Sequence, residues 1–268
     1  MSKTIGIISI KGGVGKTTIA ASLASDLAHN FNKKVLLVDA NFSAPNLGLH
    51  MDIVEPSNTI HEVLAKKAKI KDAIHSRFGV DVIPGSYVAD YELNPLKLKK
   101  ELKEIKGNYD FVILDSSPSL NIEILSTIFA SDNLFIVTTP DYSTLSCSIK
   151  ATKFAQQCGK EISGVIINKI QEPRYEFSLK DIENALEAPV IAKIHYDKNA
   201  QRASFLRVPS PLYNKKSSLS REINAISRAL TGNMEKKSFS QWLFASTKKE
   251  VVNRQLLKES FYNREFSS

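Results

Sequence analysis

Cysteine is scarce in this sequence, which contains Cys147 and Cys158 and no other. Two thiols eleven residues apart can form neither a disulfide framework nor a metal site by themselves. We therefore expect both cysteines to serve as small apolar side chains. Such a shortage of cysteine is typical of a protein that folds in a reducing, intracellular compartment.

Long apolar runs are also absent. No stretch approaches the roughly 18–20 residues that a membrane-spanning helix needs. The first helix-like stretch follows Thr17 and is preceded by a glycine-rich loop, which is not the layout of a signal peptide. We therefore expect a soluble, cytoplasmic protein.

The charge balance is only moderately basic, with 36 lysines and arginines against 28 acidic residues and a net charge of +8. This excess permits anionic partners such as nucleotides, nucleic acid or acidic lipid, but it does not choose among them. The chain has 268 residues, of which 43% are hydrophobic. That share is enough to bury a core, so disorder over the whole length is excluded.

Short apolar runs recur along most of the chain, at residues 4–10, 35–38, 80–83, 111–114, 134–137, 164–167 and 190–194. They are continuous rather than alternating, which is typical of strands buried on both faces of a parallel sheet. Helix-like segments lie between and after them, at 58–68, 96–105, 123–129, 145–157, 179–186 and 219–230. The pattern predicts an α/β domain over residues 1–232, with a doubly wound, mostly parallel sheet, helices on both faces and Gly232 ending the last helix.

Residues 233–268 differ in character, because they contain no strand-like run and hold the single tryptophan. Phe239, Trp242 and Leu243 share a helical face by their spacing, and a second apolar group follows at 252–261. We interpret this segment as an amphipathic helical tail that meets an anionic membrane surface. Packing on the α/β domain, or on a partner protein, remains the alternative.

A glycine-rich loop separates the first apolar run from the first helical segment. Its glycines let backbone N–H groups turn inward around phosphate oxygens, and the following helix points its positive end at the same place. In this pattern Lys16 reaches the terminal phosphates and the Thr17 hydroxyl holds Mg²⁺. The predicted phosphate cradle consists of Gly12, Gly13, Val14, Gly15, Lys16, Thr17 and Thr18.

Two carboxylates end apolar runs. Asp39 follows the second run and Asp115 follows the fourth. Strand ends of a parallel sheet form its ligand-binding edge, and Mg²⁺ keeps several waters between itself and protein carboxylates. We therefore predict that Asp39 and Asp115 are metal partners together with Thr17. A helix-capping role is the alternative for Asp115.

The loop at residues 11–18, Lys-Gly-Gly-Val-Gly-Lys-Thr-Thr, resembles the deviant Walker A loop of the MinD/ParA family of P-loop ATPases. The resemblance extends to about residue 232 and is closer to the MinD branch. Further segments that carry it are 38–41 with 45–49 (similar to switch I), 82–86, 109–118 (similar to Walker B and switch II) and 138–141.

The resemblance implies ATP or ADP and Mg²⁺ as cofactors and an ATP-dependent homodimer. It implies that Lys11 reaches across that dimer to the partner's phosphates, although Lys11 could instead only raise the local potential. Asn168 would contact adenine, with His195 and Asp197 beside the base. ATP is favoured over GTP because no guanine-selecting aspartate follows Asn168-Lys169.

Asn41 departs from the family pattern, which usually has an aspartate there to orient the attacking water. An amide can hydrogen-bond water but cannot accept its proton, so we expect slow hydrolysis that rests on positioning and electrostatics. His195 is a second departure, since the family often has proline at this place. The iron–sulfur carriers of the family have cysteines close in sequence, which Cys147 and Cys158 do not match.

These observations favour an ATP-dependent, dimerising switch ATPase that positions a regulatory or cargo protein in the cell, for example in cell division, with a peripheral location on the inner membrane face. One alternative is a non-hydrolysing ATP-binding scaffold. Another is ParA-like, non-specific DNA binding through the basic segment 97–103, which a solvated helix face explains equally well. Nucleic acid is therefore the least favoured partner.

Overall fold

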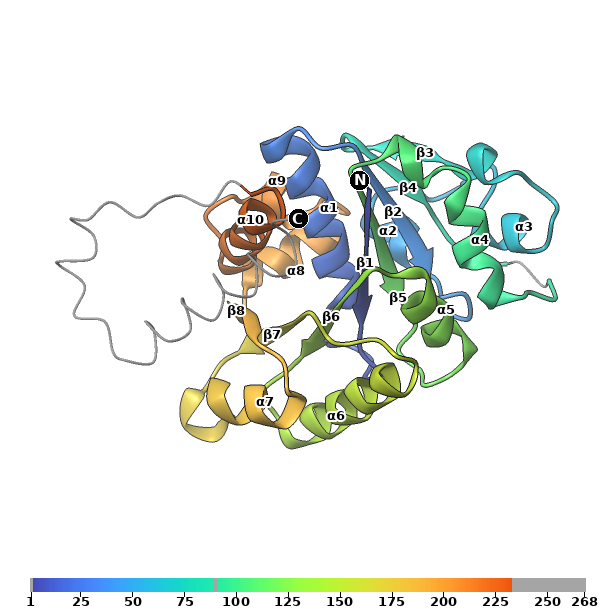
Figure 1. The fold of residues 1–268 in the computed structure, drawn as a ribbon. Helices are drawn as coiled ribbons and strands as arrows, with labels where there is room; N and C mark the ends of the chain where they lie inside the picture. The colour runs from blue at the N-terminus through green and yellow to red at the C-terminus, as the bar shows by residue number, and fades with distance from the viewer. Residues whose placement is uncertain (1, 89–90, 233–268) are drawn as a thin grey trace.

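The computed structural model describes residues 2–88 and 91–232, and these form one sheet with helices packed on both of its faces (Figure 1). The sheet has the order β3-β4-β2-β5-β1-β6-β7-β8. Neighbouring strands are parallel except for β3 and β4. The strands are β1 (Lys3–Ile8), β2 (Val35–Ala40), β3 (His75–Arg77), β4 (Val80–Ile83), β5 (Phe111–Ser116), β6 (Asn133–Thr138), β7 (Gly164–Ile170) and β8 (Val190–His195).

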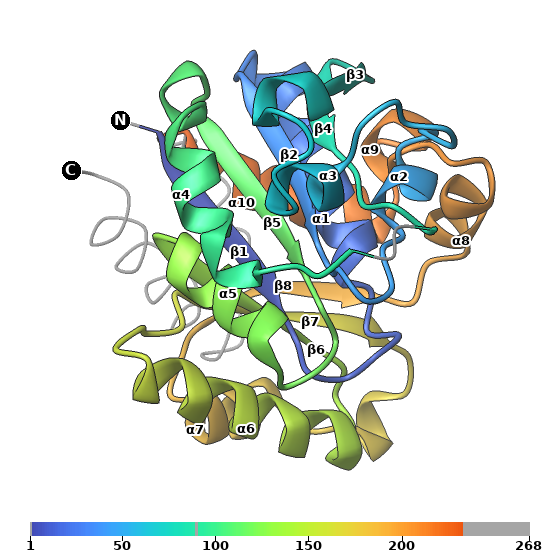
Figure 2. The ribbon, with the colours of Figure 1, turned by 90° about the vertical axis from the view of Figure 1, so that its right-hand side faces the viewer.

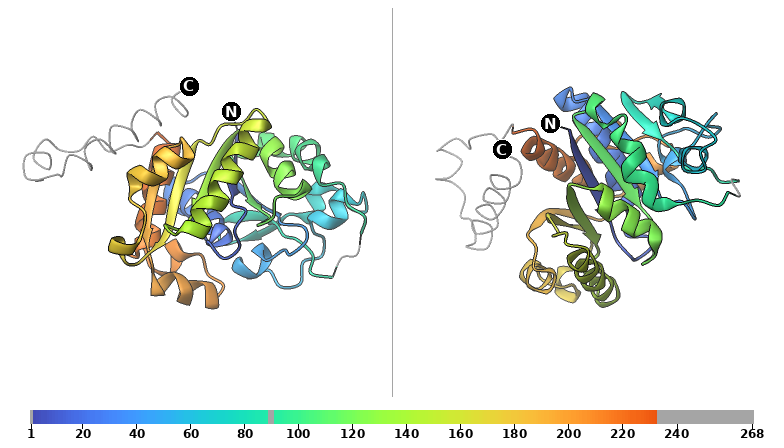
Figure 3. Two further views of the ribbon diagram at one scale, coloured as in Figure 1. Left: turned by 90° about the horizontal axis from the view of Figure 1, so that it is seen from below. Right: turned by 45° about the vertical axis from the view of Figure 1, so that its right-hand side comes forward.

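The helices form two layers, which Figure 2 and Figure 3 show from other directions. One layer contains α1 and α10, and the other contains α3 to α7. The helices are α1 (Lys16–Phe31), α2 (Leu47–His50), α3 (Ile60–Leu64), α4 (Leu98–Lys103), α5 (Ile122–Ala130), α6 (Tyr142–Gln157), α7 (Leu179–Leu186), α8 (Lys198–Phe205), α9 (Ser210–Tyr213) and α10 (Ser218–Leu230). The predicted doubly wound α/β fold is confirmed.

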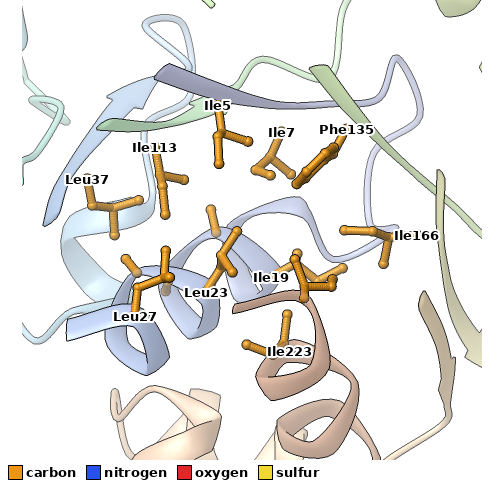
Figure 4. Close-up of a cluster of buried hydrophobic side chains, with 14 of the residues drawn as sticks. Ile5, Ile7, Ile19, Leu23, Leu27, Leu37, Ile113, Phe135, Ile166 and Ile223 are labelled. Atoms are coloured by element: carbon orange, nitrogen blue, oxygen red, sulfur yellow. The ribbon is translucent and has the colours of Figure 1, made fainter. Parts of the chain in front are cut away.

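The central strands are apolar throughout because successive side chains enter opposite cores. Ile7 packs with α1 and α10, whereas Ile8 packs with α5, α6 and α7. Leu37 and Leu36 divide in the same way between the two faces. Figure 4 shows the core on the α1 side, where strand residues meet α1 and α10. Burial on both faces explains why these runs do not alternate with polar residues.

Several element boundaries differ from the predictions. The first strand ends at Ile8 rather than at residue 10, and the helix predicted over 58–68 is reduced to α3. The strands β2 and β5 continue to Ala40 and Ser116, so Asp39 and Asp115 lie inside strands rather than beyond them. The short elements β3, α2, α8 and α9 were not predicted, because three to eight residues carry little periodicity.

The predicted end of the last helix at Gly232 agrees with the backbone. Gly232 follows α10 with a φ of 71°, the left-handed conformation that favours glycine after a helix. Both cysteines are free, and Cys158 packs against the α6–α7 core as the apolar filler that we expected. Among the described residues, no helix is long and apolar enough to cross a membrane. The predicted tail, 233–268, lies outside the described residues.

Candidate functional site

A cavity of about 460 Å³ lies at the carboxyl edge of the sheet, where α1 begins. This is the edge at which open α/β sheets bind ligands. Ten predicted site residues line the cavity, namely Gly12, Gly13, Gly15, Lys16, Thr17, Thr18, Asn41, Asn168, His195 and Asp197. Four others, Lys11, Val14, Asp39 and Asp115, are not among the described residues that line it.

The glycine-rich loop is held open from β7. The Asn168 side-chain amide donates to the Val14 carbonyl at 2.7 Å, and Lys169 Nζ donates to the Gly13 carbonyl at 2.7 Å. Gly13 and Gly15 have φ values of 78° and 101°, a region that favours glycine. Two side chains therefore fix the loop from outside, which leaves its N–H groups for a ligand.

Replacing Gly15 by alanine is expected to weaken ATP binding about 5- to 150-fold. A Cβ there would lie 2.5 Å from Asn168 Nδ2, and the positive φ adds backbone strain. Strain of about 1–3 kcal/mol converts to that range at about 1.4 kcal/mol per tenfold. Isothermal calorimetry measures the change, with Gly107→Ala as control because no atom lies within 4 Å of its added Cβ. Equal affinity of the two variants would contradict the assigned loop geometry.

Lys16 and Asp115 form the charged centre of the site. Lys16 is only 7% exposed, and burial lowers its pKa while the negative Asp115 opposes this shift. Both carboxylate oxygens of Asp115 are buried and have no hydrogen-bond partner among the described residues. Burial raises the pKa of Asp115, and the nearby Thr17 hydroxyl, which itself donates to Asn46, and the Lys16 charge lower it in part. An unpartnered buried carboxylate is costly, so this arrangement calls for a cationic ligand.

The donor set fits Mg²⁺. This ion binds through one or two carboxylates together with substrate phosphates and retains several waters. Asp115 supplies a free carboxylate and Thr17 a hydroxyl, which donates to Asn46 Oδ1 at 3.0 Å. No cluster of three histidine, cysteine or acidic residues able to hold a metal occurs among the described residues.

Asp39 is held by backbone N–H groups of the loop that follows β2. Its carboxylate accepts the backbone N–H groups of Asn41, Asn46 and Leu47 at 3.0–3.1 Å and is fully buried. In the register of the parallel strands β2 and β5, Asp39 stands opposite Asp115. Burial and the neighbouring Asp115 raise the pKa of Asp39, and the three N–H groups oppose the shift. This carboxylate therefore shapes the loop after β2, and its predicted role as a metal partner stays a prediction.

Asn41 reaches the cavity from that loop. Its side-chain NH₂ group donates to the Ala44 carbonyl, which fixes the orientation of the amide. The remaining oxygen, Oδ1, is buried and has no partner among the described residues. Asn41 therefore offers one free acceptor at the cavity, as the predicted interaction with water requires.

The far end of the cavity is formed by β8, α8 and α10. His195 is exposed and its backbone N–H donates to Ser218 Oγ at 3.1 Å. Asp197 accepts the backbone N–H groups of Asn199 at 2.8 Å and Leu219 at 3.4 Å, so it joins the starts of α8 and α10. Although burial raises it, these hydrogen bonds hold the pKa of Asp197 below its usual value. Contact of His195 and Asp197 with a base stays a prediction.

Comparisons with known proteins agree with this geometry. The AAA domain family matches residues 2–165. An ATP-binding protein of Methanocaldococcus jannaschii is 35% identical, over 87% of this chain and 89% of the relative. A virulence plasmid ParA family protein of Chlamydia psittaci is 30% identical, over 75% of this chain and 83% of the relative. The chain belongs to the MinD/ParA family of P-loop ATPases.

Solved structures of family members share the fold. The septum site-determining protein MinD of Pyrococcus horikoshii, complexed with Mg-ADP, is 27% identical with a TM-score of 0.79, covering 92% of this chain and 100% of that one. The MinC:MinD cell division complex of Aquifex aeolicus contains a chain 26% identical, also with a TM-score of 0.79, covering 88% and 98%. Nucleotide and Mg²⁺ binding therefore occur in this family, as does association with a partner protein.

Sequence reasoning missed several residues of this family member's site. Asn46 holds the Thr17 hydroxyl, Lys169 holds the loop, and Ser143 accepts a hydrogen bond from Lys11 Nζ at 2.9 Å. Asn46 and Lys169 stood inside or beside segments that carried the family resemblance, which was a usable signal. Ser143 had none, because its contact joins residues 132 positions apart.

Proposed function

We propose that this protein is an ATP-dependent switch that binds Mg·ATP, dimerises, and hydrolyses ATP slowly while it positions a partner protein in the cell. The observation that carries the proposal is the buried, unpartnered Asp115 carboxylate beside Lys16 and Thr17, under a loop that offers its N–H groups. The similar MinD proteins act in septum site determination and cell division, so cell division is the process that we propose first.

The chain's own residues divide the work as follows. The loop N–H groups and Lys16 hold the terminal phosphates, and Thr17 and Asp115 hold the metal. When bound, Mg²⁺ neutralises charge on the phosphate oxygens. Asn41 Oδ1 accepts a hydrogen bond from the attacking water without taking its proton. Positioning without a base is the reason why we expect slow turnover.

Steady-state phosphate release with Mg·ATP tests this proposal. Phosphate release by the wild-type protein that is lost in the Lys16→Ala variant would support the proposed switch function. Tight ATP binding without any turnover would instead favour the alternative of a non-hydrolysing scaffold. In that case the Asn41 substitution has abolished hydrolysis and ATP acts as a structural clamp.

The alternative of non-specific DNA binding would require an affinity for DNA that falls steeply as the salt concentration rises. Its candidate helix, α4, buries Leu98, Glu101 and Leu102 and exposes its lysines, as an ordinary solvated helix does.

For location, we propose a cytoplasmic protein that attaches peripherally to the inner membrane face through residues 233–268. The expected result is that the full chain sediments with anionic liposomes more in ATP than in ADP, because a dimer doubles a weak attachment. Trp242→Ser with Leu243→Ser should abolish sedimentation, and Lys71→Ala, an exposed lysine of the folded domain, is the control. Equal sedimentation of all three proteins would remove the membrane role of the tail.

A further inference from the structure

The residue after Asn41 is held from two distant helices. The Phe42 backbone N–H donates to Glu123 Oε2 at 3.1 Å, and the Phe42 carbonyl lies 2.9 Å from His61 Nε2. The neighbouring Ser43 hydroxyl donates to the other oxygen of Glu123. Glu123 is on α5 and His61 is on α3, so both partners come from outside the loop that they hold.

His61 has a fixed orientation and tautomer. The backbone N–H of Ser86 donates to His61 Nδ1 at 3.0 Å, so Nδ1 carries no hydrogen and Nε2–H is the donor to Phe42. The imidazole is 2% exposed, and it meets the Phe42 ring edge-on with centroids 6.1 Å apart. The backbone and the side chain of Phe42 are therefore both engaged by His61.

Glu123 links two segments that border the cavity, the loop after β2 and the segment after β5. It is 5% exposed and lies in the first turn of α5, where the positive end of a helix favours a carboxylate. The segment that leads into α5 begins at Asp115 and includes Ser116 and Pro118, which line the cavity. The carboxylate thus connects the segment after β5 to the loop after β2.

We propose that Glu123 and His61 are positioning residues for ATP hydrolysis, which hold Phe42 so that Asn41 Oδ1 faces the attacking water. This inference rests on the proposed function. In the step itself the water oxygen bonds to the terminal phosphorus, the bond to ADP breaks with its electron pair, and the water proton passes to the phosphate. Asn41 orients this water, and a misplacement of about 1 Å can cost about 100-fold in rate.

The main test compares two buried glutamates in the full-length protein. Glu123→Gln is expected to lower kcat about tenfold while the Kd for ATP stays within about twofold, because the phosphate loop is untouched. Glu101→Gln is the matched control, since Glu101 is equally buried at 5% exposed but pairs with Lys66 rather than with the loop after β2. Loss of kcat in both variants would indicate general destabilisation and overturn the inference.

A double mutant distinguishes a positioning role of Glu123, exerted through Asn41, from a role in stability alone. If Glu123 acts through Asn41, adding Glu123→Gln to Asn41→Ala should lower kcat no further than Asn41→Ala alone. Multiplied losses would overturn the inference. If Glu123→Gln folds poorly, Ser43→Ala can replace it, because it removes only one hydrogen bond to Glu123 at an exposed position. We expect Ser43→Ala to lower kcat less than Glu123→Gln, and to cause no further loss when Asn41 is already alanine.

Hydrogen exchange separates failure of this inference from failure of the proposed function. Glu123→Gln should speed amide exchange over residues 42–47, and Glu101→Gln should not, whether or not ATP is hydrolysed. Unchanged exchange in Glu123→Gln would overturn the inference even in an active enzyme. A wild-type protein that releases no phosphate would defeat proposed hydrolysis, and with it the catalytic consequence, while the exchange result still decides whether Glu123 holds the loop.

Discussion

Replacing Lys16 by alanine is expected to weaken ATP binding at least about 30-fold and to abolish phosphate release. The lysine is buried beside Asp115 at the base of the phosphate loop. Its removal takes away the cation that offsets the charge of the phosphates and leaves the buried Asp115 carboxylate without the neighbouring lysine. Truncating one partner of a buried charge pair costs about 2–5 kcal/mol, which is the basis for this magnitude. Isothermal calorimetry with Mg·ATP measures the change.

A second lysine serves as the control for this experiment. Lys160 is half-buried and donates to the Ser131 carbonyl at 2.8 Å, away from the cavity. Lys160→Ala should bind ATP like the wild type, and thermal melting without nucleotide would show whether either variant has lost its fold. Unchanged affinity in a folded Lys16→Ala protein would mean that the glycine-rich loop does not bind phosphates as we assign it.

The sheet could be predicted because its strands are buried on both faces. A strand such as β5 appears in the sequence as four consecutive apolar residues, Phe111 to Leu114, and this run alone is enough to predict it. The antiparallel β3 could not be found in this way, since two of its three residues are exposed and its sequence is polar. The helix α8 was not predicted for a similar reason, because Ala203 is its single buried residue and one buried position gives no apolar pattern.

In the candidate site, too, residues with a local sequence pattern could be predicted, and residues held by long-range contacts could not. The phosphate loop is local, so residues 12–18 carry their own signal of glycines before a helix. The loop contacts of Asp39 could not be predicted, because the N–H groups of Asn46 and Leu47 reach its carboxylate only when the chain turns back. Glu123 has no local signal at all, since its partner Phe42 is 81 positions away. Residues that act through long-range hydrogen bonds are therefore found only in the folded chain.

Replacing Lys11 by alanine is expected to leave ATP binding within about twofold of wild type while ATP-dependent dimerisation and turnover are lost. Lys11 is not among the described residues that line the cavity of its own chain, and its ammonium lies at the surface against Ser143 at the start of α6. A dimer that brings two ATP molecules together must offset the repulsion of their phosphates. A lysine supplied by each chain to the other does so, and at close range such a charge is worth several kcal/mol.

Light scattering with and without ATP measures the dimer, and Ser143→Ala provides the discriminating control. That variant removes the partner of Lys11 within the chain but keeps the ammonium group. If Lys11 acts on the other chain, Ser143→Ala dimerises as well as the wild type, or better, because the lysine is released. If Lys11 instead supports its own chain through Ser143, both variants lose turnover together. A normal ATP-dependent dimer from Lys11→Ala would reduce this residue to a local charge, and the chemistry of the switch would then have to lie within a single chain.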